Sequence, residues 1–270
     1  NESFENLMFP VKRAPWPSTW IGDDEVGIKE EKALKKLSEL LQVPTAAVIL
    51  EPLLQGAGGM NVVRPKFIQK VSELVKKNNS LLIADEVLTG FGRCGSLFSF
   101  QKAKIKPDLI AISKGLTGGF LPMGITLAKE EIFQSFISDS PEKTFWHGHS
   151  FTANPLGCAA ANASLDLLEK EPHKYINFEQ KHLMLIEKIK HLPIVKKIRI
   201  CGTMIAFEID VDKDKGYLNN IGKRIKGLSI EKGLFLRPLG NIVYLLPPLC
   251  VSDYQLEKSY QIIYEILTTI

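Results

Sequence analysis

The segment Asp108-Leu-Ile-Ala-Ile-Ser-Lys114-Gly115, an apolar run that ends in lysine and glycine, decides the predicted fold of this chain. A second apolar run, Leu81-Leu-Ile-Ala-Asp85-Glu-Val87, lies a short way upstream and ends in carboxylates. Both runs are short and aliphatic, which predicts two buried strands. Lys114 and Asp85 would therefore stand at the ends of neighbouring strands.

Strands and helices alternate around these two runs. The predicted elements are strands at 46–51, 81–87, 109–113 and 124–128, and helices at 65–77 and 154–169. Short apolar strands separated by helices predict an α/β fold with a mainly parallel sheet that is covered on both faces. In such sheets ligands gather at the carboxyl ends of the strands, which here carry Glu51, Asp85 and Lys114.

After Lys170 the pattern changes to that of a smaller α+β unit. We expect helices at 175–190, 216–232 and 252–270, two strands at 195–210 that break at Gly202, and two strands at 234–246 around Pro238-Leu-Gly240. The chain is therefore predicted to hold a partial large domain at 1–169 and a small C-terminal domain at 170–270.

Composition excludes several classes of protein. The 270 residues are 45% hydrophobic and 24% charged, as in a soluble globular protein, and a scattered net charge of +4 favours neither nucleic acid nor a membrane as partner. Four widely spaced cysteines without a CxxC pair indicate reduced thiols in a cytoplasmic protein. Because the chain begins at Asn1 and residues 1–24 read as an extended connection, we expect the natural protein to be longer.

Lys114 and Asp85 suggest a chemistry when they are taken together. Most single lysines are solvated surface charges, but a lysine at a strand end beside an acid suits a Schiff-base enzyme that uses pyridoxal phosphate. An acid at the end of a strand as apolar as LLIAD needs a cationic partner, and a protonated pyridine nitrogen is one. A nearby arginine or a helix cap would satisfy Asp85 equally well.

Two further segments could bind anions. His147-Gly148-His149-Ser150-Phe-Thr152 places backbone amides and hydroxyls just ahead of a predicted helix, which favours a phosphate contact or plain loop packing. A metal site at the two histidines is disfavoured because no third ligand cluster is visible. Arg237 ends an apolar run, where its guanidinium could bind a substrate carboxylate or form a structural salt bridge. The GAGG at 56–59 lacks the context of a nucleotide-binding loop.

Several motifs taken in order resemble one known family. They are ILEPLLQGAGGM, LLIADEVLTGFGRCG, DLIAISKGLTGG, FWHGHSFTANPLGCAAANASL and LFLRPLGNIVYLLPP. Together they resemble the class III (fold type I) pyridoxal-phosphate aminotransferases from about Pro44 onward. GAGGM, the HGHSF run and RPLGNIVYLLPP are more similar to the members of biotin synthesis than to the ornithine or 4-aminobutyrate enzymes.

This resemblance implies roles for residues around the cofactor, pyridoxal 5'-phosphate. Lys114 would form the internal aldimine and later move the proton, and Asp85 would hold the pyridine nitrogen. Val87 would pack against the ring face, and Gln55 would approach the ring hydroxyl.

It also implies roles farther along the chain. Ser150 would contact the cofactor phosphate across the interface of a homodimer, with His149 beside it. Gly148 would lie near the substrate, and Arg237 would hold the carboxylate of the oxo acid. The implied reaction moves an amino group from S-adenosylmethionine to 8-amino-7-oxononanoate by a ping-pong mechanism.

One departure from the family is large. The resemblance implies an N-terminal segment with a Gly-Ser phosphate loop and an aromatic residue that stacks on the ring, and these 270 residues do not carry it. The alternatives are an omega-amino acid or ornithine type of class III aminotransferase, or a truncated, non-catalytic protein of the same fold.

Overall fold

A computed structural model describes residues 9–210 and 220–270 of the chain. Its first part contains α1 (Val26–Leu40), β1 (Ala47–Leu50), β2 (Leu54–Gln55), β3 (Asn61–Val62), α2 (Pro65–Lys77), β4 (Leu81–Asp85), α3 (Ser99–Lys102), β5 (Leu109–Ile112), β6 (Ile125–Ala128), α4 (Glu130–Gln134) and α5 (Pro155–Lys170). The second part contains α6 (Phe178–Ile186), β7 (Val195–Cys201), β8 (Met204–Ile209), α7 (Ile221–Glu231), β9 (Ile242–Leu245) and α8 (Asp253–Leu267). The short 3₁₀ turns are η2 (Lys114–Thr117), η3 (Pro141–Lys143) and η4 (Pro172–Lys174).

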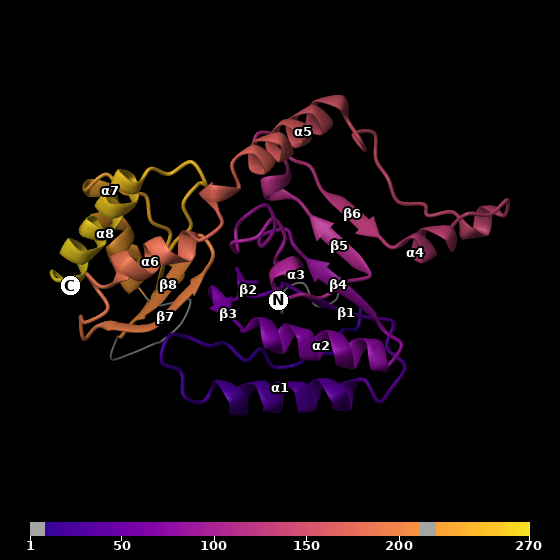
Figure 1. Cartoon of the computed structure of the whole chain (residues 1–270), viewed down its shortest axis with the longest axis horizontal. Helices are drawn as coiled ribbons and strands as arrows, with labels where there is room; N and C mark the ends of the chain where they lie inside the picture. The colour runs from indigo at the N-terminus through magenta and orange to yellow at the C-terminus, as the bar shows by residue number, and fades with distance from the viewer. Residues whose placement is uncertain (1–8, 211–219) are drawn as a thin grey trace.

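The larger sheet has the strand order β1-β4-β5-β6 (Figure 1). The first three strands are parallel, and β6 pairs with β5 in the antiparallel sense. This confirms the predicted α/β fold with its mainly parallel sheet. The edge strand turns back because its connection from β5 holds the turn η2 instead of a covering helix.

The two faces of this sheet differ. On one face Val48, Leu50 and Leu82 pack in a single core with Phe67 and other residues of α2. On the opposite face Ile49 and Leu81 are 59% and 37% exposed. The prediction that both faces are covered is therefore wrong for the described chain. An apolar strand pattern shows that a face needs cover, but it cannot show whether the cover comes from the same polypeptide.

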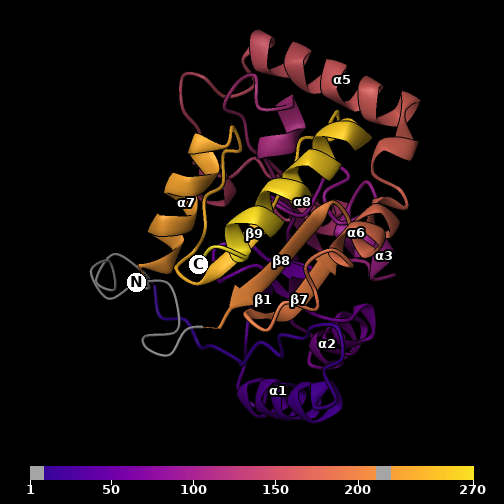
Figure 2. The same ribbon diagram turned by 90° about the vertical axis from the view of Figure 1, so that its left-hand side faces the viewer.

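The second part of the chain is built on the antiparallel sheet β7-β8-β9 (Figure 2). Its core joins apolar side chains of β8, such as Phe207, to those of α8, such as Tyr260. The predicted break at Gly202 is confirmed between β7 and β8. The strand expected before Pro238 is not formed: Leu239 only bridges to Ile242, because proline lacks an N–H and a tight turn follows.

Buried polar contacts join the two parts. The Arg93 guanidinium donates to the Thr203 hydroxyl at 2.8 Å and to the Pro247 carbonyl at 2.7 Å. Burial lowers the pKa of Arg93, so this charge is held at some cost in solvation. Gly202 is required beside it, since an added Cβ would lie 2.2 Å from the carbonyl carbon of Cys94. The division into domains at residue 170 stays a prediction.

Candidate functional site

The turn that carries Lys114 is held from both sides. Lys114 opens η2 two residues after the end of β5 with a φ of +45°, a left-handed conformation that costs a non-glycine residue about 1–2 kcal/mol. Ser113 donates its hydroxyl to the Met123 carbonyl at 2.6 Å, and Ser164 donates to the Gly115 carbonyl at 3.0 Å. The backbone is therefore fixed on either side of Lys114, while the lysine side chain itself is exposed.

Two carboxylates stand beside this turn. Leu50 of β1 is in register with Ala84 of β4, so Glu51 and Asp85, which follow them, come side by side on strands about 5 Å apart. Glu51 accepts the N–H of Gly56 at 3.0 Å. Burial, and secondarily the charge of Asp85, raises the pKa of Glu51, whereas the Gly56 N–H and the nearby Lys114 cation oppose that rise. The structure thus brings Glu51, Asp85 and Lys114 together at the carboxyl end of the sheet.

Glu86 is a neighbouring acid to which the sequence analysis gave no role. It is fully buried, accepts the Thr89 hydroxyl at 2.5 Å and the Phe100 N–H at 2.7 Å, and burial raises its pKa. Since successive strand residues face opposite sides, Asp85 points toward the candidate site and Glu86 toward the interior. The pair Asp-Glu after an apolar run was a signal that one acid of the two would be buried.

The predicted phosphate-binding residues lie on a segment that leaves the sheet. We use the term arm for residues 129–154, which include α4 and η3 and extend away from the sheet before α5 (Figure 1). His147, Gly148, His149 and Ser150 are all exposed on it. The arm also exposes large apolar side chains, among them Trp146 at 81% and Phe151 at 75%.

The remaining predicted residues are distributed over both parts. Val87 lies two residues after the end of β4 and donates its N–H to Asp85 Oδ1 at 3.1 Å, so it lies at the site. Gln55 is half-buried in the small hairpin of β2 and β3, paired with Asn61. Arg237 is exposed between α7 and β9 in the second part of the chain.

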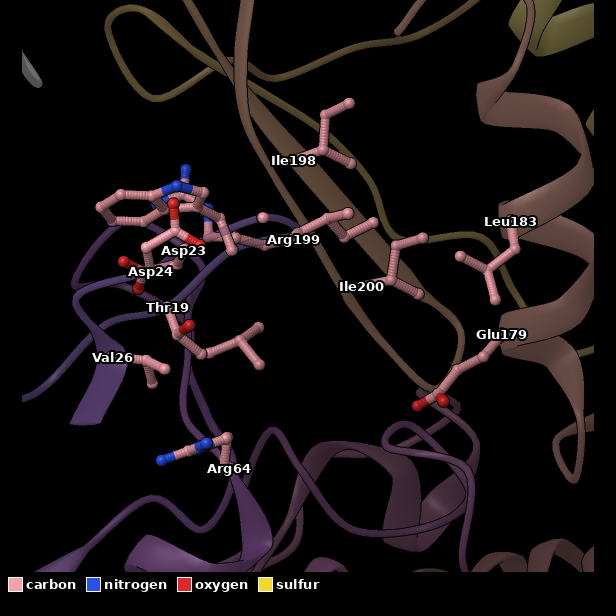
Figure 3. Close-up of a pocket in the computed structure, with 14 residues that line it drawn as sticks. Thr19, Asp23, Asp24, Val26, Arg64, Glu179, Leu183, Ile198, Arg199 and Ile200 are labelled. Atoms are coloured by element: carbon pink, nitrogen blue, oxygen red, sulfur yellow. The ribbon is translucent and has the colours of Figure 1, made fainter.

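A cavity of about 480 Å³ lies elsewhere, between the segment 19–26, α6 and β7. Figure 3 shows Glu179 and Leu183 on one side of it and Thr19 and Arg64 on the other. Arg199 also lines it, and its Nε and Nη2 have no hydrogen-bond partner in the described residues. Those two nitrogens are sealed from solvent, so a molecule in the cavity would not reach them. None of the predicted site residues borders this cavity.

Neither a metal centre nor a membrane span is found in the part of the chain that the structure describes. Within residues 9–210 and 220–270, no three His, Cys, Asp or Glu side chains gather in a way that could hold a metal ion. In the same residues, every helix is too short or too polar to cross a bilayer.

Comparisons with known proteins agree on one family. The family described as "Aminotransferase class-III" matches residues 1–267. The adenosylmethionine-8-amino-7-oxononanoate aminotransferase of Synechococcus elongatus is 49% identical over 271 residues, which cover 100% of this chain and 64% of that relative. The enzyme of the same name from Geobacter sulfurreducens is 37% identical over 94% of this chain and 59% of its own length. The chain thus spans less than two thirds of the length of these relatives.

Solved structures that resemble this chain are also aminotransferases. The adenosylmethionine-8-amino-7-oxononanoate aminotransferase of Methanocaldococcus jannaschii superposes with a TM-score of 0.82 at 31% identity, covering 99% of this chain and 62% of that one. An ornithine aminotransferase of Toxoplasma gondii, in a structure described as having partial occupancy of PLP at the active site, gives a TM-score of 0.76 at 28% identity. It covers 88% of this chain and 54% of that one.

Proposed function

Because the chain belongs to the class III aminotransferase family, we propose that it carries the Lys114 part of an aminotransferase site that binds pyridoxal phosphate. We propose further that its substrates are S-adenosylmethionine as amino donor and 8-amino-7-oxononanoate as acceptor, as the names of the relatives suggest. The observation that carries the proposal is the convergence of Lys114 with Asp85 and Glu51 at the end of the parallel sheet.

The residues present fit pyridoxal phosphate. Asp85 is half-buried and its Oδ1 is occupied by the Val87 N–H, which leaves the other oxygen able to accept a hydrogen bond from a protonated ring nitrogen. Lys114 offers an exposed primary amine to an aldehyde. When bound, pyridoxal phosphate supplies a ring that takes up the electron pair released at the substrate carbon.

Each residue then has a definite task. Lys114 would attach the cofactor and, when displaced by the substrate amine, would carry a proton away from the substrate carbon through its Nζ. Asp85 would keep the ring nitrogen protonated, and Val87 would orient the ring by apolar contact. Arg237 would bind the carboxylate of the oxo acid through two parallel N–H donors.

The arm supports a further proposal about partners. His149, Ser150 and Gly148 are exposed on a segment that leaves its own sheet, so we propose that they complete the phosphate and substrate contacts of a second copy in a homodimer. Four free thiols are in keeping with a cytoplasmic protein.

The first experiment tests the cofactor. Pyridoxal phosphate added to the chain and reduced with borohydride should fix a cofactor-sized mass on the peptide that contains Lys114. Lys114→Ala should lose the near-visible absorption and the fixed mass on that peptide, while Lys66→Ala, at an exposed position on α2, should keep both. Retained absorption in Lys114→Ala would refute the attachment site.

A second experiment tests the reaction. The natural protein should convert 8-amino-7-oxononanoate in preference to 4-aminobutyrate or ornithine, with parallel lines in double-reciprocal plots, because one site serves two substrates in turn. Preference for ornithine would move the proposal to the other class III type. Cofactor binding without turnover of any of these substrates would favour a non-catalytic protein.

A further inference from the structure

Ser164 makes an unusual contact for a serine in the middle of a helix. Such a serine commonly faces solvent or bonds to a carbonyl one turn back in its own helix. In α5 the Ser164 hydroxyl instead donates to the carbonyl of Gly115, 49 residues away in the chain, at 3.0 Å. Gly115 is the residue directly after Lys114. A helix that is otherwise rich in alanine therefore directs one hydroxyl at the turn that carries the candidate lysine.

The Lys114 turn depends on contacts of this kind. A lysine with a φ of +45° relaxes to a right-handed or extended conformation unless its neighbours hold it. Within the turn, the Leu116 N–H donates to Ser113 and the Gly118 N–H donates to Gly115, each at 3.0 Å. Among the hydrogen bonds seen in residues 9–210 and 220–270, only the one from Ser164 joins the carbonyl of Gly115 to another element of the fold.

Helix α5 is well placed to act as a support. Ala161 is buried in a core with Ile112, which ends β5, and with Leu116, which lies in η2 itself, and Leu165 packs against the same core. The start of α5 is fixed by Asn154, whose side chain accepts the Gly157 N–H at 2.7 Å. The helix thus sits rigidly on the turn, and it begins where the arm ends.

We propose that Ser164 is a positioning residue for Lys114, which holds the left-handed turn so that the lysine amine projects toward Glu51 and Asp85. The proposal rests on the proposed function in taking Lys114 as the attachment site. It goes beyond that function in assigning the orientation of the amine to a side chain on α5. Loss of the hydroxyl should leave the helix intact but free the turn.

Three variants separate an effect on the position of the Lys114 amine from an effect on the stability of the fold. Ser164→Ala removes the hydroxyl, Ser164→Thr keeps it, and Asn162→Ala alters an exposed position on the same helix as a matched control. The first measurement is the rate at which pyridoxal phosphate with borohydride fixes Lys114, relative to exposed Lys143 in the same sample. The rate ratio should fall roughly threefold to tenfold in Ser164→Ala, the factor that corresponds to one lost hydrogen bond.

The second measurement needs no cofactor. A water-soluble carbodiimide joins an amine to a carboxylate that it contacts, and the yield of the Lys114–Glu51 amide by peptide mass reports where the amine points. That yield should fall in Ser164→Ala, return in Ser164→Thr and stay unchanged in Asn162→Ala. Thermal unfolding of all three variants should remain cooperative, which excludes a merely unfolded sample.

The two measurements distinguish a failure of the positioning role of Ser164 from a failure of Lys114 as the attachment site. If Ser164→Ala matches Asn162→Ala in both, the positioning role is overturned, whatever the cofactor does. If wild-type Lys114 is fixed no faster than Lys143, yet the amide yield still depends on the hydroxyl, then the proposed attachment site is wrong and the positioning role stands.

Discussion

The Lys114 turn and the arm that carries Ser150 are both candidate parts of one site, and they are built in opposite ways. The turn has strained backbone, but Ser113, Ser164 and a buried core fix it in place. Beyond the ion pair of Lys129 with Asp108 at its base, the arm is held within the described structure mainly by local contacts, such as the Trp146 indole N–H to the Pro141 carbonyl and the ring pair Phe136–Phe145.

This difference separates a turn that the chain organises by itself from an arm for which we propose a second copy as cover. Strain at Lys114 persists because its surroundings determine it, as is common at functional sites. Large exposed aromatic side chains, in contrast, are typical of a surface that contacts another molecule. Residue types that occur both on the arm and elsewhere in the chain therefore offer matched tests of this contrast.

Histidine should show the largest contrast. His182 is fully buried, donates Nε2–H to the Thr203 carbonyl and accepts the Tyr260 hydroxyl at Nδ1. Burial lowers the pKa of His182 from 6.5 to about 4, so the unfolded chain binds a proton in this range and the folded chain does not. The contribution of His182 to the free energy of unfolding should therefore be fully present above pH 6.5 and be lost as the pH falls toward 4. The loss should be roughly 3 kcal/mol, at 1.4 kcal/mol per pKa unit.

Urea unfolding at a series of pH values measures this loss. His149→Gln, on the exposed arm, should leave the pH dependence as in the wild type. Direct observation of the imidazole signals by NMR checks the cause without a variant at the buried position. A His182 ring that takes up its proton near pH 6.5 would contradict the burial argument.

Glycine should show the next contrast. A Cβ added at Gly115 would lie 2.8 Å from the Cβ of Phe91, whereas one added at Gly148 would meet only the Thr152 hydroxyl, at 3.9 Å. Gly115→Ala should therefore destabilise the chain by about 1–3 kcal/mol, the usual cost of overpacking. Gly148→Ala should change the free energy of unfolding by less than about 0.5 kcal/mol. Equal losses in denaturant unfolding would show that the arm is as closely packed as the turn.

The sequence predicts the strands and helices that position the site better than it predicts the long-range contacts that hold them in place. The helix expected at 65–77 is found at Pro65–Lys77, because its apolar residues recur at helical spacing. Short apolar runs likewise place Asp85 and Lys114 at strand ends. These elements are predictable because each is encoded by neighbouring residues.

The supports depend on contacts between distant residues. The Ser164 to Gly115 hydrogen bond spans 49 residues and leaves no periodic trace in the sequence. The left-handed φ of Lys114 is equally hidden, because lysine has no local preference for it. Arg237 and Ser150 were proposed from their local sequence and from the family resemblance, and their contacts stay predictions because their proposed partners are a substrate and the cofactor of a second copy.

Trp146 should show the smallest effect on stability and the clearest effect on association. Since its ring is 81% exposed, Trp146→Ser should change the free energy of unfolding by less than about 0.5 kcal/mol. If the arm packs on a second copy, loss of this ring should weaken self-association roughly tenfold or more, as buried tryptophans often dominate interfaces. Sedimentation over a range of concentrations measures this, with Tyr254→Ser, at an aromatic residue on α8 that is 71% exposed, as the control. Equal weakening in both variants would mean that the arm is not the contact, and the uncovered face at Ile49 and Leu81 would become the next surface to test.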